Sequence, residues 1–360
     1  MSLSIGIVGL PNVGKSTLFN ALLQKQQALA ANYPFATIEP NVGVVPVPDP
    51  LLPQLAEVVH TTHLVPATVE FVDIAGLVAG AAEGAGLGNK FLAHIREVDL
   101  IAHVVRVFDD ENILREGSID PVSDFQIIQT ELQLADLGTI EKQQPPKSSQ
   151  PTEAQERWAR LARWKEVLNQ GKNILSVLEE PEDFQLTKEL TLLTAKKQLV
   201  IMNVSEAQLA TRNAEAETLA TKLGISSKHI VPICAQLESE LAVLEGEEKI
   251  MYLEEVGLAE SGLEQLIRQA YHHLGLQSFY TAGEKEARAW TITQGTTAPQ
   301  AAGVIHTDFE KGFIRANIVS SDEFLRVGGW KAAKEQGLMR QEGKTYTMKK
   351  DDIVEFLVSS

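Results

Sequence analysis

The stretch that decides the fold is Gly9-Leu10-Pro11-Asn12-Val13-Gly14-Lys15-Ser16-Thr17, a complete G-x-x-x-x-G-K-[ST] phosphate loop. An apolar, strand-like run from Leu3 to Val8 precedes the loop, and a helix-like stretch follows it. Because the loop opens a helix, the backbone N–H groups of Val13, Gly14 and their neighbours are expected to turn inward around phosphates. The sequence therefore predicts a nucleoside triphosphate site.

Three side chains of this loop have predicted roles. Lys15 is expected to reach the β and γ phosphates of the nucleotide. Ser16 is placed to ligate Mg²⁺ through its hydroxyl group, and Thr17 shares the helix start with it. Since no other residue supplies the Lys15 contact, we expect hydrolysis to depend on this side chain.

A second signature follows the strand-like run that ends at Phe71-Val72-Asp73-Ile74-Ala75-Gly76, which contains D-x-x-G. Asp73 is predicted to hold Mg²⁺ through a water molecule, and the Gly76 N–H group to donate to the γ phosphate. Such a loop senses whether that phosphate is present. Upstream, Thr37 is the best candidate for a first switch residue that closes on Mg²⁺, an inference from its position alone.

The order of elements predicts an α/β fold with a parallel sheet. Helix-length segments alternate with five apolar, β-branched runs: Leu3 to Val8, Thr68 to Val72, Leu100 to Val107, Gln198 to Asn203 and His229 to Cys234. In such sheets ligands bind at the carboxyl ends of the strands. Longer apolar runs such as Leu100 to Phe108, which His103 and Arg106 interrupt, are too short to span a membrane.

A helical hairpin interrupts this pattern. Residues 123–142 show helical spacing of apolar residues, 143–151 contain Pro145 and Pro146 and read as a loop tip, and a second helix is expected from Thr152. Two interpretations remain open: a helical elaboration that only packs on the core, and an arm that binds a partner.

Composition narrows the possible partners and compartment. The net charge of −16 argues against a surface that binds polyanions everywhere, but residues 278–360 carry eleven Lys and Arg against eleven Asp and Glu. If any part meets RNA, we expect it to be this one or the helical insert. The single cysteine, Cys234, fits a reducing cytoplasm, and the start of the chain lacks the basic region of a signal peptide.

The last part of the chain has a different pattern of apolar residues and turns. Short β-like runs at 289–293, 313–319 and 353–357 are separated by turns that contain glycine, which predicts a small mixed domain around a sheet.

Together these motifs resemble the YchF or Obg-like ATPase family over nearly the whole chain. Besides the phosphate loop and D-x-x-G, the matches include Pro34 to Asn41 and Asn203-Val204-Ser205-Glu206. The most specific matches are in the tail: Ala289-Trp290-Thr291, Ala298 to Gly303 and His306 to Phe313. The resemblance implies a GTPase-type nucleotide domain in residues 1–122 and 185–277, a coiled-coil-like insert in 123–184 and a TGS domain of β-grasp fold in 278–360. It also implies association with ribosomes or ribosomal RNA; no feature points to DNA.

Base recognition distinguishes this chain from GTPases of similar architecture, which usually carry N-K-x-D. Here Glu206 replaces the aspartate of that motif, so the carboxylate is one methylene further from the backbone. Val204 replaces the lysine, whose stem would lie along the base. Asn203 can still hydrogen-bond to a purine edge. A buried donor without its acceptor costs roughly 1–3 kcal/mol, enough to reverse a preference between two purines. The resemblance independently implies ATP over GTP, and Cys234 and Ala235 are expected to line the base pocket.

The sequence offers few candidates for residues that assist hydrolysis directly. Leu77 stands where Ras-like GTPases place the glutamine that positions water, so hydrolysis should be slow. Asn12 matches the asparagine by which related GTPases ligate K⁺ beside the phosphates. The family usually has histidine where this chain has Arg115, which leaves two interpretations: an arginine that acts on phosphate charge, or a solvated residue of an acidic loop.

The leading hypothesis is an Mg²⁺-dependent ATPase that works as a slow switch in translation. A GTPase is the alternative within the same class. A nucleotide-gated binding module, whose hydrolysis is incidental, is the alternative from another class.

Overall fold

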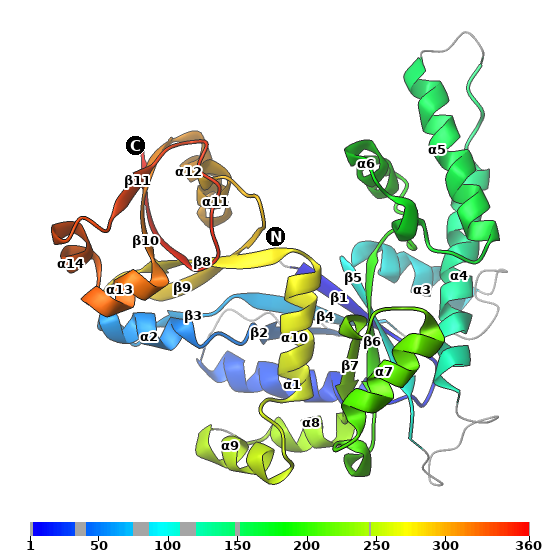
Figure 1. Ribbon diagram of the computed structural model, residues 1–360, viewed down its shortest axis with the longest axis horizontal. Coiled ribbons are helices and arrows are strands. Elements are labelled where there is room, and N and C mark those ends of the chain that lie inside the picture. The colour runs from blue at the N-terminus through cyan, green and yellow to red at the C-terminus, as the bar shows by residue number, and fades with distance from the viewer. Residues whose placement is uncertain are drawn as a thin grey trace. The chain divides into compact units, whose positions relative to one another are not determined.

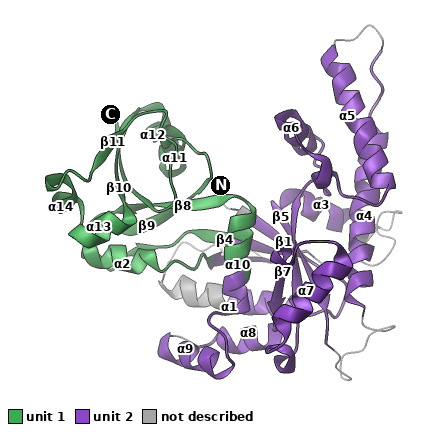
Figure 2. Ribbon diagram, viewed as in Figure 1, with its two compact units in different colours: residues 1–2, 46–69, 266–360 green, residues 3–45, 70–265 purple. Residues whose placement is uncertain are grey.

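The computed structural model describes residues 3–32, 41–74, 86–108, 120–147, 152–244 and 246–359 (Figure 1). The chain forms two compact units (Figure 2). The larger unit comprises residues 3–45 and 70–265, and the smaller unit comprises residues 1–2, 46–69 and 266–360. The predicted α/β class is confirmed.

The larger unit contains a six-stranded sheet flanked by helices. Its strands, in spatial order, are β2 (Val42–Pro46), β4 (Thr68–Asp73), β1 (Leu3–Val8), β5 (Leu100–Arg106), β6 (Lys197–Asn203) and β7 (Ile230–Ile233). β1, β5, β6 and β7 pair in parallel, and every residue of β5 and β7 is buried, as expected for strands covered on both faces. The carboxyl ends of these strands therefore meet at one edge of the sheet.

The helices of this unit include the predicted hairpin. They are α1 (Lys15–Asn32), α3 (Gly86–Glu97), α4 (Pro121–Glu141), α5 (Thr152–Asn169), α6 (Pro181–Glu189), α7 (Arg212–Leu223), α8 (Ala235–Leu241) and α9 (Gly246–Glu255), with 3-10 turns at Ile174–Val177, Glu206–Gln208 and Ser227–His229. α10 (Gly262–His273) runs from the larger unit into the smaller one.

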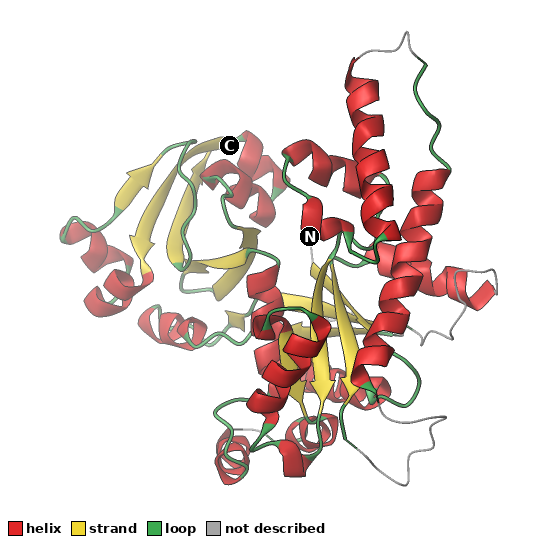
Figure 3. Cartoon of the chain, turned by 45° about the vertical axis from the view of Figure 1, so that its right-hand side comes forward, coloured by secondary structure: helices red, strands yellow, loops and turns green. Residues whose placement is uncertain are grey.

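The hairpin helices α4 and α5 lie close to their predicted limits. Figure 3 draws these and the other helices in red. α4 begins after Asp120, whose carboxylate accepts from the N–H groups of Val122 and Ser123 at 3.0 and 3.1 Å. This is an N-cap, and the proline at the first helical position suits it. Beyond the cap, α4, α5 and α6 share a buried apolar cluster: Ile140, Leu161, Trp164, Leu168, Ile174, Leu186 and Leu192.

A buried polar network joins the sheet to α4. The Nε2 atoms of His103 (β5) and Gln129 (α4) lie 3.1 Å apart, and Gln129 Nε2 also donates to Gln198 Oε1 of β6 at 2.6 Å. Asn173 Nδ2 in turn donates to Gln129 Oε1 at 2.8 Å. Burial lowers the pKa of His103 to about 3, so the imidazole is neutral in the folded chain.

His103 should make folding sensitive to acid. Because the unfolded chain protonates this imidazole near pH 6.5, its contribution to stability is complete above that pH. The contribution is then lost as pH falls towards 3, by up to about 1.4 kcal/mol per unit. Urea unfolding at pH 7.5 and 5 should show this loss, and His103→Gln should reduce the difference. An unchanged difference, or an equal reduction in the exposed-residue control His272→Gln, would show that His103 is not responsible.

The smaller unit contains the β-grasp-like sheet that was expected near the carboxyl terminus. Its strands, in spatial order, are β11 (Arg340–Glu342), β10 (Phe313–Ser320), β12 (Asp352–Val358), β8 (Leu276–Ala282), β9 (Ala287–Thr293) and β3 (Leu64–Val65). Its helices are α2 (Leu51–Val58), α11 (Ala298–Ile305), α12 (Thr307–Lys311), α13 (Ser321–Val327) and α14 (Trp330–Glu335).

Two apolar clusters hold this sheet. In one cluster, Ala298, Ala301 and Ala302 of α11 pack with Phe279 and Phe313. In the other, Leu52 and Leu55 of α2 pack with Tyr280, Val319 and Phe324.

The compact units differ from the predicted domain limits in two places. Residues 46–69, predicted with the nucleotide domain, belong to the smaller unit, and that unit takes up the chain at Leu266 rather than at Ser278. The physical reason is burial: α2 covers apolar strand residues, and β3 adds to the edge of the sheet by pairing with β9. β3 is only two residues long, so no sign of this pairing was present in the sequence.

Candidate functional site

The phosphate loop leaves β1 and enters α1, as predicted. At Gly9, a Cβ atom would lie 2.7 Å from the carbonyl oxygen of Val104 in the neighbouring strand β5. At Gly14, φ is +98° and a Cβ atom would lie 2.2 Å from Nδ2 of Asn203. Both glycines are therefore required by close approach, and Gly14 also by its backbone conformation. Asn12 has a left-handed φ of 62° and is exposed at the turn.

Lys15 is held against its own loop. Its Nζ atom donates to the Leu10 carbonyl oxygen at 2.7 Å, and the residue is 9% exposed. Burial lowers the pKa of Lys15, and the charge of Asp73 opposes that shift. Burial likewise raises the pKa of Asp73, which the Lys15 charge opposes. A cation and a carboxylate thus lie near each other at the loop, each at a desolvation cost that a charged ligand can offset.

The described metal candidates suit Mg²⁺. Ser16 is exposed in the first turn of α1, and Asp73 is half-buried at the end of β4. Their hydroxyl and carboxylate oxygens are the kind of ligand that Mg²⁺ prefers. Thr37, Gly76, Leu77 and Arg115 lie outside the described residues. Among the residues that are described, no three His, Cys, Asp or Glu side chains gather into a metal-binding group, and no helix is long and apolar enough to cross a membrane.

Asn203 links the two loops that were assigned separately to phosphates and base. Its Nδ2 atom donates to the Val13 carbonyl oxygen at 2.9 Å, and its Oδ1 atom accepts from the Ala235 N–H group at 3.1 Å. The residue is 3% exposed at the end of β6. One Nδ2 proton remains for a ligand, since an amide nitrogen carries two. The sequence identified Asn203 as a base contact but not as this link.

The other base-side candidates are divided between core and surface. Glu206 is exposed, and it opens the 3-10 turn after β6. Val204 is 1% exposed and packs in a core cluster with Met202 and Leu209, so its side chain does not present a surface along which a base could lie. Val204, which its place in the motif puts among the nucleotide-binding candidates, therefore offers a base no side-chain contact.

The residues predicted after β7 lie at the start of α8. Cys234 is buried before the helix, and burial raises the pKa of its thiol, which fits a small apolar residue better than a redox-active one. Ala235 is buried and contributes its N–H group to Asn203.

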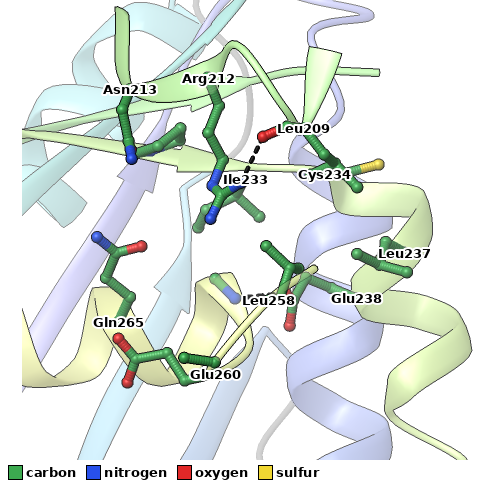
Figure 4. A pocket seen from close by; sticks show the side chains of 13 residues that line it. Leu209, Arg212, Asn213, Ile233, Cys234, Leu237, Glu238, Leu258, Glu260 and Gln265 are labelled. Atoms are coloured by element: carbon green, nitrogen blue, oxygen red, sulfur yellow. Dashed lines mark hydrogen bonds between the residues drawn. The ribbon is translucent and has the colours of Figure 1, made fainter. Parts of the chain in front are cut away.

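A pocket of about 160 Å³ lies beside Cys234 (Figure 4). It is lined by the start of α7, by β7 and α8, and by the turn into α10. There Arg212 donates to the Leu209 carbonyl oxygen, and Glu238 Oε1 accepts from the Gly262 N–H group at 2.7 Å. Of the predicted nucleotide residues it contains only Cys234, and it is smaller than typical ligand pockets. It is therefore distinct from the phosphate site.

Arg106 is a residue of the site edge that the motifs did not identify. It is 1% exposed at the end of β5, and its Nε atom donates to the Phe108 carbonyl oxygen at 2.9 Å. The guanidinium carbon lies 4.7 Å from the centre of the Phe108 ring. The available signal was a single cation at the carboxyl end of an otherwise apolar strand.

Comparisons with known proteins agree with this geometry. Residues 4–128 match the family model MMR_HSR1, described as a 50S ribosome-binding GTPase, and residues 276–359 match YchF-GTPase_C, described as a protein of unknown function (DUF933). Relatives named ribosome-binding ATPase YchF from Bacillus subtilis (strain 168) and Escherichia coli O157:H7 are each 48% identical, over 99% of this chain and 99% of theirs. The solved structure of the Schizosaccharomyces pombe YchF GTPase is 36% identical, with a TM-score of 0.88 over 99% of this chain and 98% of that one. The chain belongs to the YchF family.

Proposed function

We propose that this protein is an Mg²⁺-dependent nucleoside triphosphatase that prefers ATP over GTP, hydrolyses it slowly and acts as a ribosome-associated switch in the cytoplasm. The observation that carries the proposal is the Asn203 link between the phosphate loop and the start of α8, with Glu206 in place of the guanine-clamp aspartate. Relatives at 48% identity are named ribosome-binding ATPases, which supports the same class of activity.

The described residues divide the work as follows. The loop N–H groups from Val13 to Thr17 bind the phosphates, and Lys15 exchanges the Leu10 carbonyl for phosphate oxygens. Ser16 and Asp73 would hold Mg²⁺, which supplies charge neutralisation at the β and γ phosphates. Asn203 offers its remaining proton to a purine nitrogen that adenine and guanine share, so discrimination between the bases must come from elsewhere, and we assign it to Glu206.

Roles outside the described residues follow from the sequence alone. Thr37 would complete the Mg²⁺ site, and the Gly76 N–H group would donate to the γ phosphate. Leu77 offers no group to orient water, which is the reason to expect slow turnover. For Arg115 two interpretations remain open: an arginine that acts on phosphate charge, and a solvated residue of an acidic loop.

ATP preference is the first test of this proposal. Titration with fluorescent ATP and GTP analogues should show ATP binding at least about fivefold tighter, because a misplaced carboxylate leaves guanine donors unpaired. Glu206→Asp should shift the ratio towards GTP, whereas Glu217→Asp, at an exposed position on α7, should not. We leave Val204 unchanged because a lysine there would enter the core. Equal or tighter GTP binding by the wild-type chain would favour the GTPase alternative.

Potassium dependence is the second test. Asn12 lies exposed in the phosphate loop, where its side-chain oxygen could help to ligate K⁺ beside the phosphates. Turnover should therefore rise when K⁺ replaces Na⁺ at constant ionic strength, because the ion stabilises transition-state charge as an arginine finger does. Asn12→Ala should remove the response. Identical rates in the two salts, or a response that survives Asn12→Ala, would exclude this role.

The binding-module alternative makes a different forecast. If hydrolysis is incidental, variants that block hydrolysis should bind ribosomes as the wild-type chain does in every nucleotide state. If the chain is a switch, ribosomes should accelerate its turnover, and binding should differ between the triphosphate and diphosphate forms.

A further inference from the structure

One apolar cluster connects the γ-phosphate side of the site to the helical insert. We call it the Ile74 cluster; Ile74 directly follows the Mg²⁺ candidate Asp73. Its buried members are Val8, Ile74, Phe91, Leu92, Ile95, Val98, Ile101, Ile128, Leu132 and Leu193. They come from the end of β1, the residue after β4, α3 and the turn after it, β5, α4 (the first helix of the insert) and the turn before β6. Leu10 of the phosphate loop packs against the same cluster.

Lys196 secures the far end of α3. Its Nζ atom donates to the carbonyl oxygen of Arg96 at 3.0 Å and to that of Val98. These carbonyls lie in the last turn of α3 and directly after it, where a cation also interacts favourably with the helix dipole. Lys196 comes from the turn before β6, so a side chain distant in sequence fixes the helix that follows the Asp73 strand.

Asp136 of α4, in the insert, forms hydrogen bonds with the same turn. Its Oδ1 atom accepts from the Leu193 N–H group at 2.8 Å, and its Oδ2 atom accepts from the N–H and Oγ1 groups of Thr194, both at 2.7 Å. The carboxylate is buried, and the charges of Asp136 and Lys196 interact. Polar contacts therefore join both α4 and the end of α3 to the turn at 193–196, beside the Ile74 cluster.

We propose that Asp136 and Lys196 are positioning residues for nucleotide hydrolysis: they join α3 to α4, so that the insert responds to the γ phosphate and a partner on the insert changes turnover. Such coupling is reciprocal when expressed in binding free energies. The inference rests on the proposed function for its reaction, and on the contacts above for its route. Each of the two side chains ties one helix to the turn at 193–196: Lys196 contacts the end of α3, and Asp136 is part of α4.

The experiment compares full-length variants at position 196. Lys196→Met should lower kcat at least about fivefold while changing the affinity for a non-hydrolysable triphosphate by less than twofold. Lys196→Arg, which keeps the cation, should restore most of kcat. The matched control is Lys249→Met, which removes an ion pair to Glu264 between α9 and α10 and leaves the Ile74 cluster untouched. It should leave kcat unchanged.

Hydrogen exchange gives a readout that a purely structural role would not move. In the wild-type chain, amides of residues 121–141 should exchange more slowly with the triphosphate analogue than with the diphosphate. Lys196→Met and Asp136→Asn should each remove that difference. Lys249→Met should retain it.

Three results would overturn the inference: exchange in 121–141 that is identical in both nucleotide states, a Lys196→Met chain that loses thermal stability but keeps kcat, or equal losses of kcat in Lys196→Met and Lys249→Met. Failure of the proposed function would look different, because the wild-type chain would then hydrolyse neither ATP nor GTP. Exchange in 121–141 could still be compared between bound nucleotides in that case.

Discussion

Replacing Lys15 by alanine should abolish hydrolysis, with a fall in turnover of at least about 10²–10³-fold. The reason is electrostatic: we expect Lys15 to meet the charge that develops on the transferred phosphoryl group, and preorganised contacts of this kind contribute about that much. Phosphate release measured in single-turnover experiments, with saturating ATP and Mg²⁺, would show the effect.

A second substitution at this position, Lys15→Met, separates activity from stability. Burial lowers the pKa of Lys15, so the folded chain holds this cation at a cost that only the Leu10 carbonyl and the Asp73 charge offset. Lys15→Met keeps the apolar stem and removes the charge, and we expect it to leave the melting temperature unchanged or higher while activity is lost. A Lys15→Met chain that unfolds at lower temperature would show that the cation stabilises the loop. Lys249→Met, far from the phosphates in sequence, should retain turnover.

The part of the site that could be predicted from the sequence was the part formed by short, contiguous motifs. The phosphate loop and the D-x-x-G strand carry residue types at fixed spacing, and the structure has β1 and β4 where those motifs require them. Contacts between distant segments were not predictable. Nothing near Asn203 in sequence indicates that its amide bridges Val13 and Ala235, and nothing near Asp136 indicates Thr194, because each pairing depends on how the strands are ordered.

Burial explains the remaining differences. Val204 was assigned to the nucleotide site by its place in a motif, but it directly follows β6 and its side chain is 1% exposed, packed in the core with Met202 and Leu209. Residues 46–69 were assigned by sequence order, yet their apolar residues pack on strands that come more than two hundred positions later. A parallel sheet is recognisable from runs of apolar residues, whereas the surface that a short helix covers is not.

That packing changes how the ribosome contact must be tested. A chain that ends at Gln277 would be cut inside β8 and would leave Leu52 and Leu55 of α2 without the sheet they cover. Exposure of such a surface favours aggregation, so we expect this truncated chain to be insoluble or partly unfolded. Loss of binding after truncation would therefore say nothing about docking, and substitutions in the full-length chain are required.

The helical insert and the smaller unit are the two candidate surfaces for ribosome binding, and they differ in whether their cationic side chains form ion pairs. In the insert, Arg157 pairs with Glu189, Arg160 and Arg163 with Asp183, and Lys165 with Glu141. Those cations are already neutralised by carboxylates that an RNA phosphate would have to displace. In the smaller unit, Lys331 and Lys334 of α14 and Lys344 are exposed, and within the described part of the chain they form no ion pair.

We therefore expect ribosome binding to depend on the smaller unit. Lys331 and Lys334 lie three positions apart on α14 and so share one helix face. Lys331→Glu with Lys334→Glu should weaken co-sedimentation with ribosomes and reduce the salt dependence of log K by about 1.5–2, because two phosphate contacts and their released counterions are lost. The control Lys142→Glu with Lys188→Glu makes the same charge change at exposed positions of the insert and should have little effect. The reverse result, with binding lost only in the insert variant, would move the docking surface to the helical hairpin.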